Sequence, residues 1–248
     1  MDLALSGRRA LVTGASSGLG LGCAQALAAE GALVTLVARS AERLAAAAAT
    51  IPARVHTLAF DLGELDGIGQ LVADAQAAMG GVDIVIVNAG GPPAGNFAST
   101  PFERYQPALQ LNLLSGVALC EAALPGMRQR GWGRIVAITS MSVREPMANL
   151  ILSNTARAGF TAFLKTVATE VAADGVTVNT LQPGLHNTDR LAALYGGDAA
   201  VAAAGVPTHT LGDPTDFGCV AAFLCSDAAK FITGASIPVD GGALHGLQ

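Results

Sequence analysis

The feature that most constrains this chain is a regular alternation of short apolar runs, rich in β-branched residues, with longer stretches rich in alanine and leucine. Strands buried on both faces read as continuous apolar runs, and parallel strands need a long crossover, usually a helix. The pattern therefore predicts an α/β fold, a doubly wound parallel sheet of about seven strands with helices on both faces. The expected strands are 8–14, 32–38, 54–62, 82–91, 133–140, 176–184 and 236–242, and the main helices are 18–31, 41–50, 66–80, 102–130, 153–175 and 213–226.

The chain is expected to form a single domain over residues 1–248, because no linker, repeat or low-complexity tract divides the pattern. The stretch 185–212 has the poorest pattern, which predicts a mobile substrate lid of loops and short helices. After it, Asp213 is expected to cap the last helix, with Pro214 at the first helical position.

Composition narrows the function classes. With 51% hydrophobic residues the chain is not disordered, and no uninterrupted apolar run approaches the ~18 residues of a membrane span. A net charge of −5 without a basic run argues against nucleic acid as a partner. The four cysteines form no C-x-x-C pair, and no signal-peptide pattern opens the chain, so a cytoplasmic location is expected. No His, Cys, Asp and Glu residues have metal-ligand spacing, so no metal site is expected.

A glycine-rich turn, residues 13–20, lies between the first expected strand and the first expected helix. A dinucleotide needs glycine there because the backbone must turn tightly and approach the pyrophosphate, while the helix start supplies free N–H groups. The strand–turn–helix setting distinguishes this turn from a plain one. The cofactor-binding residues expected in it are Gly14, Ser16, Ser17, Gly18, Leu19 and Gly20.

The end of the second strand, Ala38-Arg39-Ser40, indicates which cofactor binds. An acid there would accept hydrogen bonds from the adenosine ribose and favour NAD. Arg39 instead matches the charge and planar geometry of a 2′-phosphate, so NADP(H) is expected. The alternative interpretation of Arg39 is a solvated residue at the start of a helix.

Six motifs in order resemble the short-chain dehydrogenase/reductase family over essentially the whole chain, and this resemblance implies their roles. The turn at 13–20 matches that family's cofactor turn, and the C-terminal ITGASIPVDGG is similar to the closing segment of 3-oxoacyl-(acyl-carrier-protein) reductases. The other matches are Asp61-Leu62 for the adenine, Asn88-Ala89-Gly90 after the fourth strand, Asn112 in the next helix, Ser140 closing the fifth strand, and Pro183-Gly184 with Thr188 at the nicotinamide end. The resemblance also implies the strand order 3-2-1-4-5-6-7 and a homo-oligomer, a tetramer or a dimer.

The chain departs from the family at its active site, a Ser followed by a Tyr thirteen residues later and a Lys four after that. Counting from Ser140, these positions hold Ser153 and Arg157. The resemblance implies that the missing phenol would donate a proton to the carbonyl oxygen, while the lysine would lower the pKa of the phenol and bind the nicotinamide ribose. Arg157 keeps the charge and the donors for the ribose. Ser153 is too weak an acid and too short to replace the phenol.

Three explanations of this departure stay open. Another group can donate the proton, either a water or His186, whose ordinary pKa suits the task, with His209 as a weaker candidate. The protein can bind NADP(H) without turnover, as a sensor or partner subunit. It can also reduce an activated carbonyl slowly, since a lost general acid costs about 10²–10⁴ in rate rather than all of it.

The expected reaction is therefore reduction of a small-molecule carbonyl, or oxidation of the matching alcohol, with a 3-oxoacyl thioester as the candidate substrate. Ser140 would hold the carbonyl oxygen, Arg157 the ribose, and Asn112 a water. The prolines of the loop 91–95 make it stiff, and its position suggests that it shapes the substrate mouth. Arg144 could meet a phosphate or carboxylate. Three arginines at 128, 130 and 134 could receive an acidic carrier protein, or simply favour a helix end.

Overall fold

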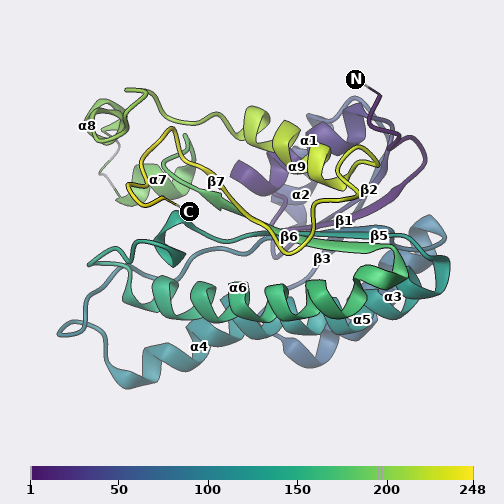
Figure 1. Cartoon of the computed structure of the whole chain (residues 1–248), viewed down its shortest axis with the longest axis horizontal. Helices are drawn as coiled ribbons and strands as arrows, with labels where there is room; N and C mark the ends of the chain where they lie inside the picture. The colour runs from purple at the N-terminus through teal and green to yellow at the C-terminus, as the bar shows by residue number, and fades with distance from the viewer. Residues whose placement is uncertain (1, 195, 197, 248) are drawn as a thin grey trace.

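The computed structural model describes residues 2–194, 196 and 198–247. Within these residues, seven strands form one parallel sheet in the order β3-β2-β1-β4-β5-β6-β7, which confirms the predicted order (Figure 1). The strands are shorter than the apolar runs that predicted them, because several of those runs continue into the turn after the strand. Their bounds are β1 Arg9–Thr13, β2 Leu33–Ala38, β3 Val55–Ala59, β4 Ile84–Val87, β5 Gly133–Ile138, β6 Val176–Pro183 and β7 Ser236–Val239.

Helices cover both faces of the sheet, as predicted. One face carries α1 (Gly18–Ala29), α2 (Ala41–Ala49) and α9 (Pro214–Cys225) (Figure 1). The other carries α3 (Ile68–Met79), α4 (Tyr105–Leu109), α5 (Ser115–Arg130) and α6 (Ile151–Val171). Since every strand runs in the same direction, all their carboxyl ends meet at one edge, and the order reverses between β1 and β4, the position where this fold class binds ligands.

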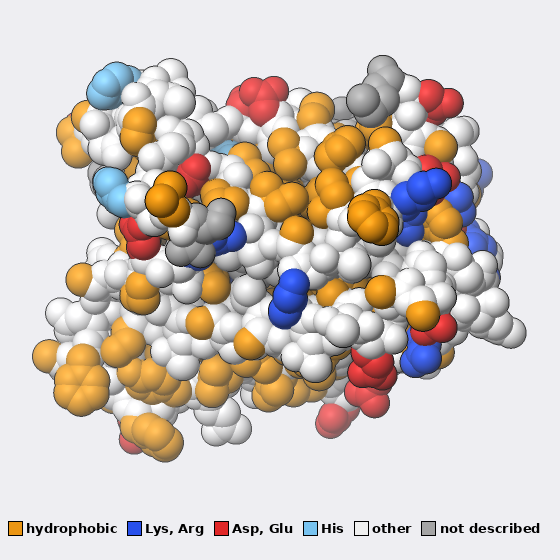
Figure 2. Space-filling view, viewed as in Figure 1, with side chains coloured by type: hydrophobic (Ala, Val, Ile, Leu, Met, Phe, Trp, Pro, Cys, Tyr) orange, Lys and Arg blue, Asp and Glu red, His pale blue; other side chains and the backbone are white. Residues whose placement is uncertain are grey.

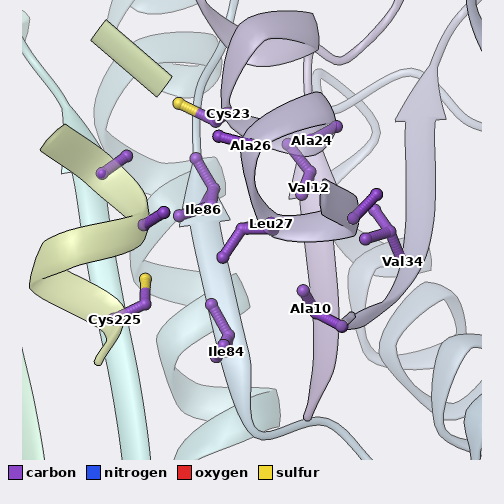
Figure 3. Packing of buried hydrophobic residues seen from close by; sticks show 14 of the residues in the cluster. Ala10, Val12, Cys23, Ala24, Ala26, Leu27, Val34, Ile84, Ile86 and Cys225 are labelled. Carbon is purple, nitrogen blue, oxygen red and sulfur yellow. The ribbon is translucent and has the colours of Figure 1, made fainter. Parts of the chain in front are cut away.

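Two hydrophobic clusters hold the helices to the sheet, one on each face. Figure 3 shows Leu27 pointing from α1 toward Ile84 and Ile86 of β4. Helix α1 packs closely on α9 because Gly22 has no side chain: a Cβ there would lie 2.0 Å from the main-chain oxygen of Pro214. Close packing of this kind fixes the start of α1, and with it the glycine-rich turn, relative to the sheet.

The long helix expected over 102–130 contains an interruption that the sequence did not predict. A 3-10 turn (Phe102–Arg104) and α4 lead into a π-helical turn, Gln110–Leu114, before α5 begins. The stretch Phe102–Arg130 is the one helical stretch among the described residues with the length and mean hydropathy of a membrane span, although 39% of its most apolar window is buried in the protein. It packs against α3 and α6, and the core helix of a globular protein passes the same test.

The region between β6 and α9 is irregular, as predicted. Two short helices, α7 (Asp189–Leu194) and α8 (Ala199–Ala204), interrupt its loops. Residues 195 and 197 of the predicted lid lie outside the described residues, and its mobility stays a prediction. The cap predicted for α9 is confirmed, because the Asp213 carboxylate accepts a hydrogen bond of 2.7 Å from the Thr215 main chain and Pro214 begins the helix.

Hydrophobic side chains gather along the lower edge of the molecule in Figure 2, where Figure 1 places α4. Phe97 and Phe102, on the segment leading into α4, expose 86% and 85% of their surface. Large exposed apolar patches are typical of protein contact surfaces. The predicted homo-oligomer stays a prediction.

Candidate active site

A cavity of about 270 Å³ opens at the carboxyl ends of the strands, where the glycine-rich turn meets the segments after β4, β5 and β6. It brings together most of the site residues predicted from the sequence. Those lining it are Gly14, Ser17, Gly18, Leu19, Asn88, Ala89, Gly90, Ser140, Ser153, Arg157, Pro183, Gly184, His186 and Thr188. Ser16 and Gly20 belong to the same turn without lining the cavity, and the other predicted residues are described below.

The glycine-rich turn is held open at the start of α1. Gly14 adopts a φ of +59°, and a Cβ on Gly20 would lie 2.3 Å from the Gly14 oxygen, so the turn admits no side chain at either position. Ser17, the residue before α1, makes no side-chain hydrogen bond to the helix start. The first N–H groups of α1 therefore keep their capacity to bind an anion, as the pyrophosphate of a dinucleotide requires.

Hydrogen bonds of Asn88 hold this turn against the end of β4. Its main-chain N–H donates to the Thr13 hydroxyl (2.9 Å), which in turn donates to the Asn88 oxygen (2.8 Å). The Asn88 side-chain amide donates to the Gly14 oxygen (3.2 Å). Beyond it, a Cβ on Gly90 would meet nothing within 4 Å, so this edge of the cavity is open. The predicted N-A-G segment thus positions the turn and leaves room beside it.

The adenosine end carries two arginines. Arg39 is exposed at the end of β2, as predicted, and Arg43 in the first turn of α2 donates a hydrogen bond of 3.2 Å to the Ser17 hydroxyl. Arg43 was not predicted as a cofactor-binding residue, although its position four residues after Arg39, in the first turn of the next helix, indicated that role. Two cations beside the glycine-rich turn suit the 2′-phosphate of NADP(H).

The pair Asp61-Leu62 follows β3 at the same edge of the sheet. The Asp61 carboxylate accepts a hydrogen bond of 2.9 Å from the Gly63 main chain, and Leu62 is buried. Neither residue lines the cavity. Their role toward the adenine stays an expectation from the family resemblance.

Ser140 and Ser153 both line the cavity but come from different elements. Ser140 follows β5, and its hydroxyl oxygen accepts a hydrogen bond of 3.1 Å from the Ser142 main chain. Ser153 lies in the first turn of α6 and is 4% exposed. The segment before α6 is tied to the loop 91–95, since the Gly95 N–H donates to the Asn149 oxygen (2.7 Å) and the Ile151 N–H to the Gly95 oxygen (3.1 Å). The loop 91–95 therefore borders the cavity, as predicted.

Arg157 is buried in α6, one turn beyond Ser153. Its Nη1 donates to the Ile138 oxygen (2.8 Å) and its Nη2 to the Ala89 oxygen (3.4 Å). Burial, with a smaller contribution from the nearby charge of Arg190, lowers the pKa of Arg157 to about 10. The guanidinium is therefore still charged at neutral pH, between the end of β5 and the N-A-G segment.

Arg190 is a second cation of the cavity, which the sequence analysis missed. It lies in α7, and its Nη2 donates to the Pro92 oxygen (3.3 Å). Its guanidinium lies directly over Gly91, where a Cβ would come within 2.2 Å of Cζ. Burial lowers the pKa of Arg190. The signal in the sequence was that Arg190 is the only lysine or arginine in the stretch 185–212.

His186 lies in the cavity wall with its ring engaged in packing. The ring meets that of Phe217 edge-on at 5.1 Å between centroids, and Nδ1 lies 3.3 Å from the Gly184 oxygen. Burial lowers the pKa of His186. A neutral ring that donates from Nδ1 to Gly184 presents only an acceptor at Nε2, which weighs against His186 as the proton donor. His209, the weaker candidate, is exposed and does not line the cavity.

Asn112 lies in the π-helical turn, which packs against α6. It is 6% exposed, and both atoms of its side-chain amide are buried without a hydrogen-bond partner among the described residues. Buried amides are nearly always paired with protein or an ordered water. This fits the water-holding role that the family resemblance implies for Asn112.

The other candidate cations are engaged elsewhere. Arg128 pairs with Asp174, Arg130 with Asp83, and Arg134 with Asp227 while stacking on Trp132. A surface for an acidic carrier protein therefore gains no support from these three arginines. Arg144 donates to the Gln182 side chain and to the Ser236 oxygen, so it joins β6 to β7 rather than facing the cavity. Among the described residues, no group of three or more His, Cys, Asp or Glu side chains could hold a metal ion.

The comparisons with known proteins agree with this geometry. A family model described as enoyl-(acyl carrier protein) reductase matches residues 14–244. The chain is 36% identical to the 3-oxoacyl-(acyl-carrier-protein) reductase of Vibrio cholerae over 240 residues, covering 96% of this chain and 98% of that protein. It is 33% identical to nodulation protein G of Azospirillum brasilense over 245 residues, covering 96% and 98% respectively.

A solved structure gives the same result for the fold. The crystal structure of L-sorbose reductase from Gluconobacter frateurii, complexed with NADPH and L-sorbose, superimposes with a TM-score of 0.92 at 33% identity. That superposition covers 100% of both chains. A structural likeness at this level extends from the sheet to the segments that border the cavity.

Proposed function

The chain belongs to the short-chain dehydrogenase/reductase family of oxidoreductases, and from this premise we propose that it reduces a small-molecule carbonyl with NADPH, using a proton donor other than the family's tyrosine. A 3-oxoacyl thioester is the candidate substrate, because the chain is similar to 3-oxoacyl-(acyl-carrier-protein) reductases over nearly its full length. The protein is further proposed to act as a homo-oligomer in the cytoplasm.

NADPH fits the residues at the strand ends. The turn with Gly14 and Gly20 leaves the start of α1 free for the pyrophosphate, Arg39 and Arg43 supply charge for the 2′-phosphate, and the open edge at Gly90 leaves room beside the N-A-G segment. Pro183, Gly184 and Thr188 would border the nicotinamide end, and Arg157 would donate to its ribose. When bound, NADPH supplies the hydride that reduces the carbonyl carbon.

The chain's own residues prepare the carbonyl oxygen for its negative charge. The Ser140 hydroxyl would donate a hydrogen bond to that oxygen, and the buried charge of Arg157 would favour electron density developing nearby. Ser153 does not supply the proton, because an aliphatic alcohol is a far weaker acid than a phenol. A water in the space left by the short Ser153 side chain is the proposed donor, and the unpaired amide of Asn112 would hold a further water behind α6.

The observation that carries this proposal is the position of Arg157. Its guanidinium bridges the Ala89 oxygen of the N-A-G segment and the Ile138 oxygen two residues before Ser140. Having Ser153 and Arg157 in place of the family's Tyr and Lys therefore keeps a positive charge between the N-A-G segment and Ser140, and removes only the acidic phenol.

A catalytically silent NADP(H)-binding protein is the second candidate. It is favoured by one observation: His186, the cavity residue whose ordinary pKa suits a proton donor, has its ring engaged with Phe217 and Gly184. This candidate predicts tight NADPH binding with no oxidation of the cofactor by any carbonyl compound.

The test of the proposed function is NADPH oxidation by the purified protein against β-keto thioesters, aldehydes and quinones. Ser140→Ala is expected to lower kcat by about 10²-fold or more, since a donor to a developing oxyanion is worth that much. Ser142→Ala is the matched control, because the main-chain N–H that Ser142 donates to Ser140 survives the substitution. Equal kcat values for the wild type and Ser140→Ala would contradict the proposed role of Ser140.

A further inference from the structure

Two guanidiniums, those of Arg157 and Arg190, line the cavity. Arg157 donates to the oxygens of Ile138 and Ala89, and Arg190 to that of Pro92. In the part of the chain that the structure describes, neither forms an ion pair with an acid. Buried charges are normally paired, because removing them from water is costly. Two cations without an acidic partner at one cavity therefore depart from the usual pairing of buried charges, and this departure needs a physical reason.

The acidic residue that lines the cavity does not compensate for these charges. Asp189 also lines the cavity, but its carboxylate turns outward to Arg43, 3.5 Å away, and is 86% exposed. The charge of Arg190 also contributes to lowering the pKa of Arg157, so the two cations repel each other across the cavity. An anion between or beside them would remove that repulsion and supply the missing partner.

Arg190 does not face the pyrophosphate end of the site. Thr188, two residues earlier, is the residue that contacts the start of α1, since its Cγ2 would lie 3.3 Å from a Cβ on Gly18. Arg190 reaches instead over Gly91 and Pro92, beyond the N-A-G segment and on the loop that borders the substrate mouth. This places the second cation on the substrate side of the cavity.

Much of the remaining cavity lining is apolar. Met141, Met147, Leu150, Leu185 and Leu194 line the same cavity. Because Arg190 presents its guanidinium beside thioether and aliphatic side chains, the cavity has the chemistry for an anionic group on an otherwise apolar body. A planar guanidinium binds a carboxylate through two parallel hydrogen bonds.

We propose that the substrate carries a carboxylate, bound by Arg190 at the mouth of the cavity while the carbonyl lies at Ser140. This inference rests on the proposed function, but replaces its candidate 3-oxoacyl thioester with a carbonyl compound bearing a free acid, or the matching hydroxy acid. It predicts that the free acid, rather than a neutral ester or amide of the same body, is the form that binds.

Calorimetric titration tests this without turnover. Butyrate and hexanoate, with butyramide and hexanamide as neutral counterparts, are titrated into the protein with and without NADP⁺. Each carboxylate is expected to bind about tenfold or more tightly than its amide, since a charge-assisted hydrogen bond is worth at least that much. Arg190→Gln removes the preference, whereas Arg190→Lys keeps part of it. Arg54→Gln, which neutralises an exposed arginine outside the cavity lining, keeps all of it.

Two results would overturn the proposal. One is equal binding of carboxylates and amides by the wild type. The other is an Arg190→Gln variant that retains the carboxylate preference, or that loses NADPH affinity instead, which would make Arg190 a ligand of the cofactor phosphates. Thermal unfolding of Arg190→Gln checks that the variant is folded. Failure of the proposed function looks different: carboxylates would bind through Arg190 while no carbonyl compound oxidises NADPH.

Discussion

The Nη1 atom of Arg157 donates a hydrogen bond of 2.8 Å to the main-chain oxygen of Ile138. This bond joins the second turn of α6 to the last residue of β5, two positions before Ser140. The family's lysine position is thus occupied by a side chain that is anchored to the sheet on one side and reaches the N-A-G segment on the other. An arginine can make both contacts because its planar head carries donors on separate nitrogens.

The substitution Gly90→Ala tests whether the cofactor lies beside the N-A-G segment. Gly90→Ala places a Cβ in open space at the cavity edge, so the free energy of unfolding is expected to stay within about 1 kcal/mol of the wild type. NADPH affinity is expected to fall about tenfold or more, because the methyl group takes room beside the N-A-G segment. Calorimetric NADPH titration and thermal unfolding measure the two effects.

Gly20→Ala is the matched comparison for Gly90→Ala. Its Cβ would lie 2.3 Å from the Gly14 oxygen, a backbone atom that cannot move aside without opening the turn. This variant is expected to lose stability and NADPH binding together. Unchanged NADPH binding by Gly90→Ala would contradict the proposed position of the cofactor.

Cofactor preference is expected to depend on Arg39 and Arg43. The double variant Arg39→Ala, Arg43→Ala removes the exposed cation at the end of β2 and the cation that donates to the Ser17 hydroxyl, and should raise the Kd for NADPH about tenfold or more while leaving that for NADH nearly unchanged. Fluorescence titration with the two cofactors measures the ratio, with Arg54→Ala as the control for loss of surface charge. A parallel loss of NADH affinity would show that the arginines support the turn rather than the 2′-phosphate.

His186 is expected to govern acid stability. Its pKa is lower in the folded protein than in the unfolded chain, because burial disfavours the charged ring. The unfolded chain therefore binds more protons as the pH falls below about 6.5, and stability is lost by up to about 1.4 kcal/mol per pH unit until the folded ring also protonates. Urea unfolding of the wild type and of His186→Gln at a series of pH values measures this slope.

His186→Gln should show a shallower slope than the wild type, whereas His209→Gln, which changes an exposed histidine, should not.

The variant His186→Gln also distinguishes between the two candidate proton donors, a water and His186. If water donates the proton, kcat of His186→Gln stays near the wild-type value. A loss of 10²-fold or more in a folded variant would instead restore His186 as the general acid.

Much of the fold was predictable because it depends on local pattern. Apolar runs separated by helices specify a parallel sheet, and Asp213-Pro214 specifies a helix start through contacts within a few residues. The glycine-rich turn could be predicted for the same reason, since residues 13–20 carry their own geometry, while their role toward the cofactor stays a prediction. The family resemblance supplied the strand order, which the sheet confirms.

The missed features depend on contacts distant in the sequence. Arg190 becomes a site residue only because α7 folds back over Gly91, nearly a hundred positions earlier. From the sequence alone, Arg130 was a candidate contact for an acidic partner protein. In the fold, Arg130 forms an ion pair with Asp83. The π-helical turn around Asn112 packs against α6, and no local residue signal predicted it. Side-chain partners of this kind are fixed by tertiary structure.

The proposed function is tested most directly by a single-turnover assay of NADPH oxidation. The assay compares the wild type with the double variant Ser153→Tyr, Arg157→Lys on the same panel of carbonyl compounds. The account predicts that the wild type oxidises NADPH with at least one acid-bearing carbonyl compound, and that product forms in equal amount. It would be contradicted by a wild type that binds NADPH without oxidising it while the double variant turns over. That result would identify a silent NADP(H)-binding protein that has lost its acid.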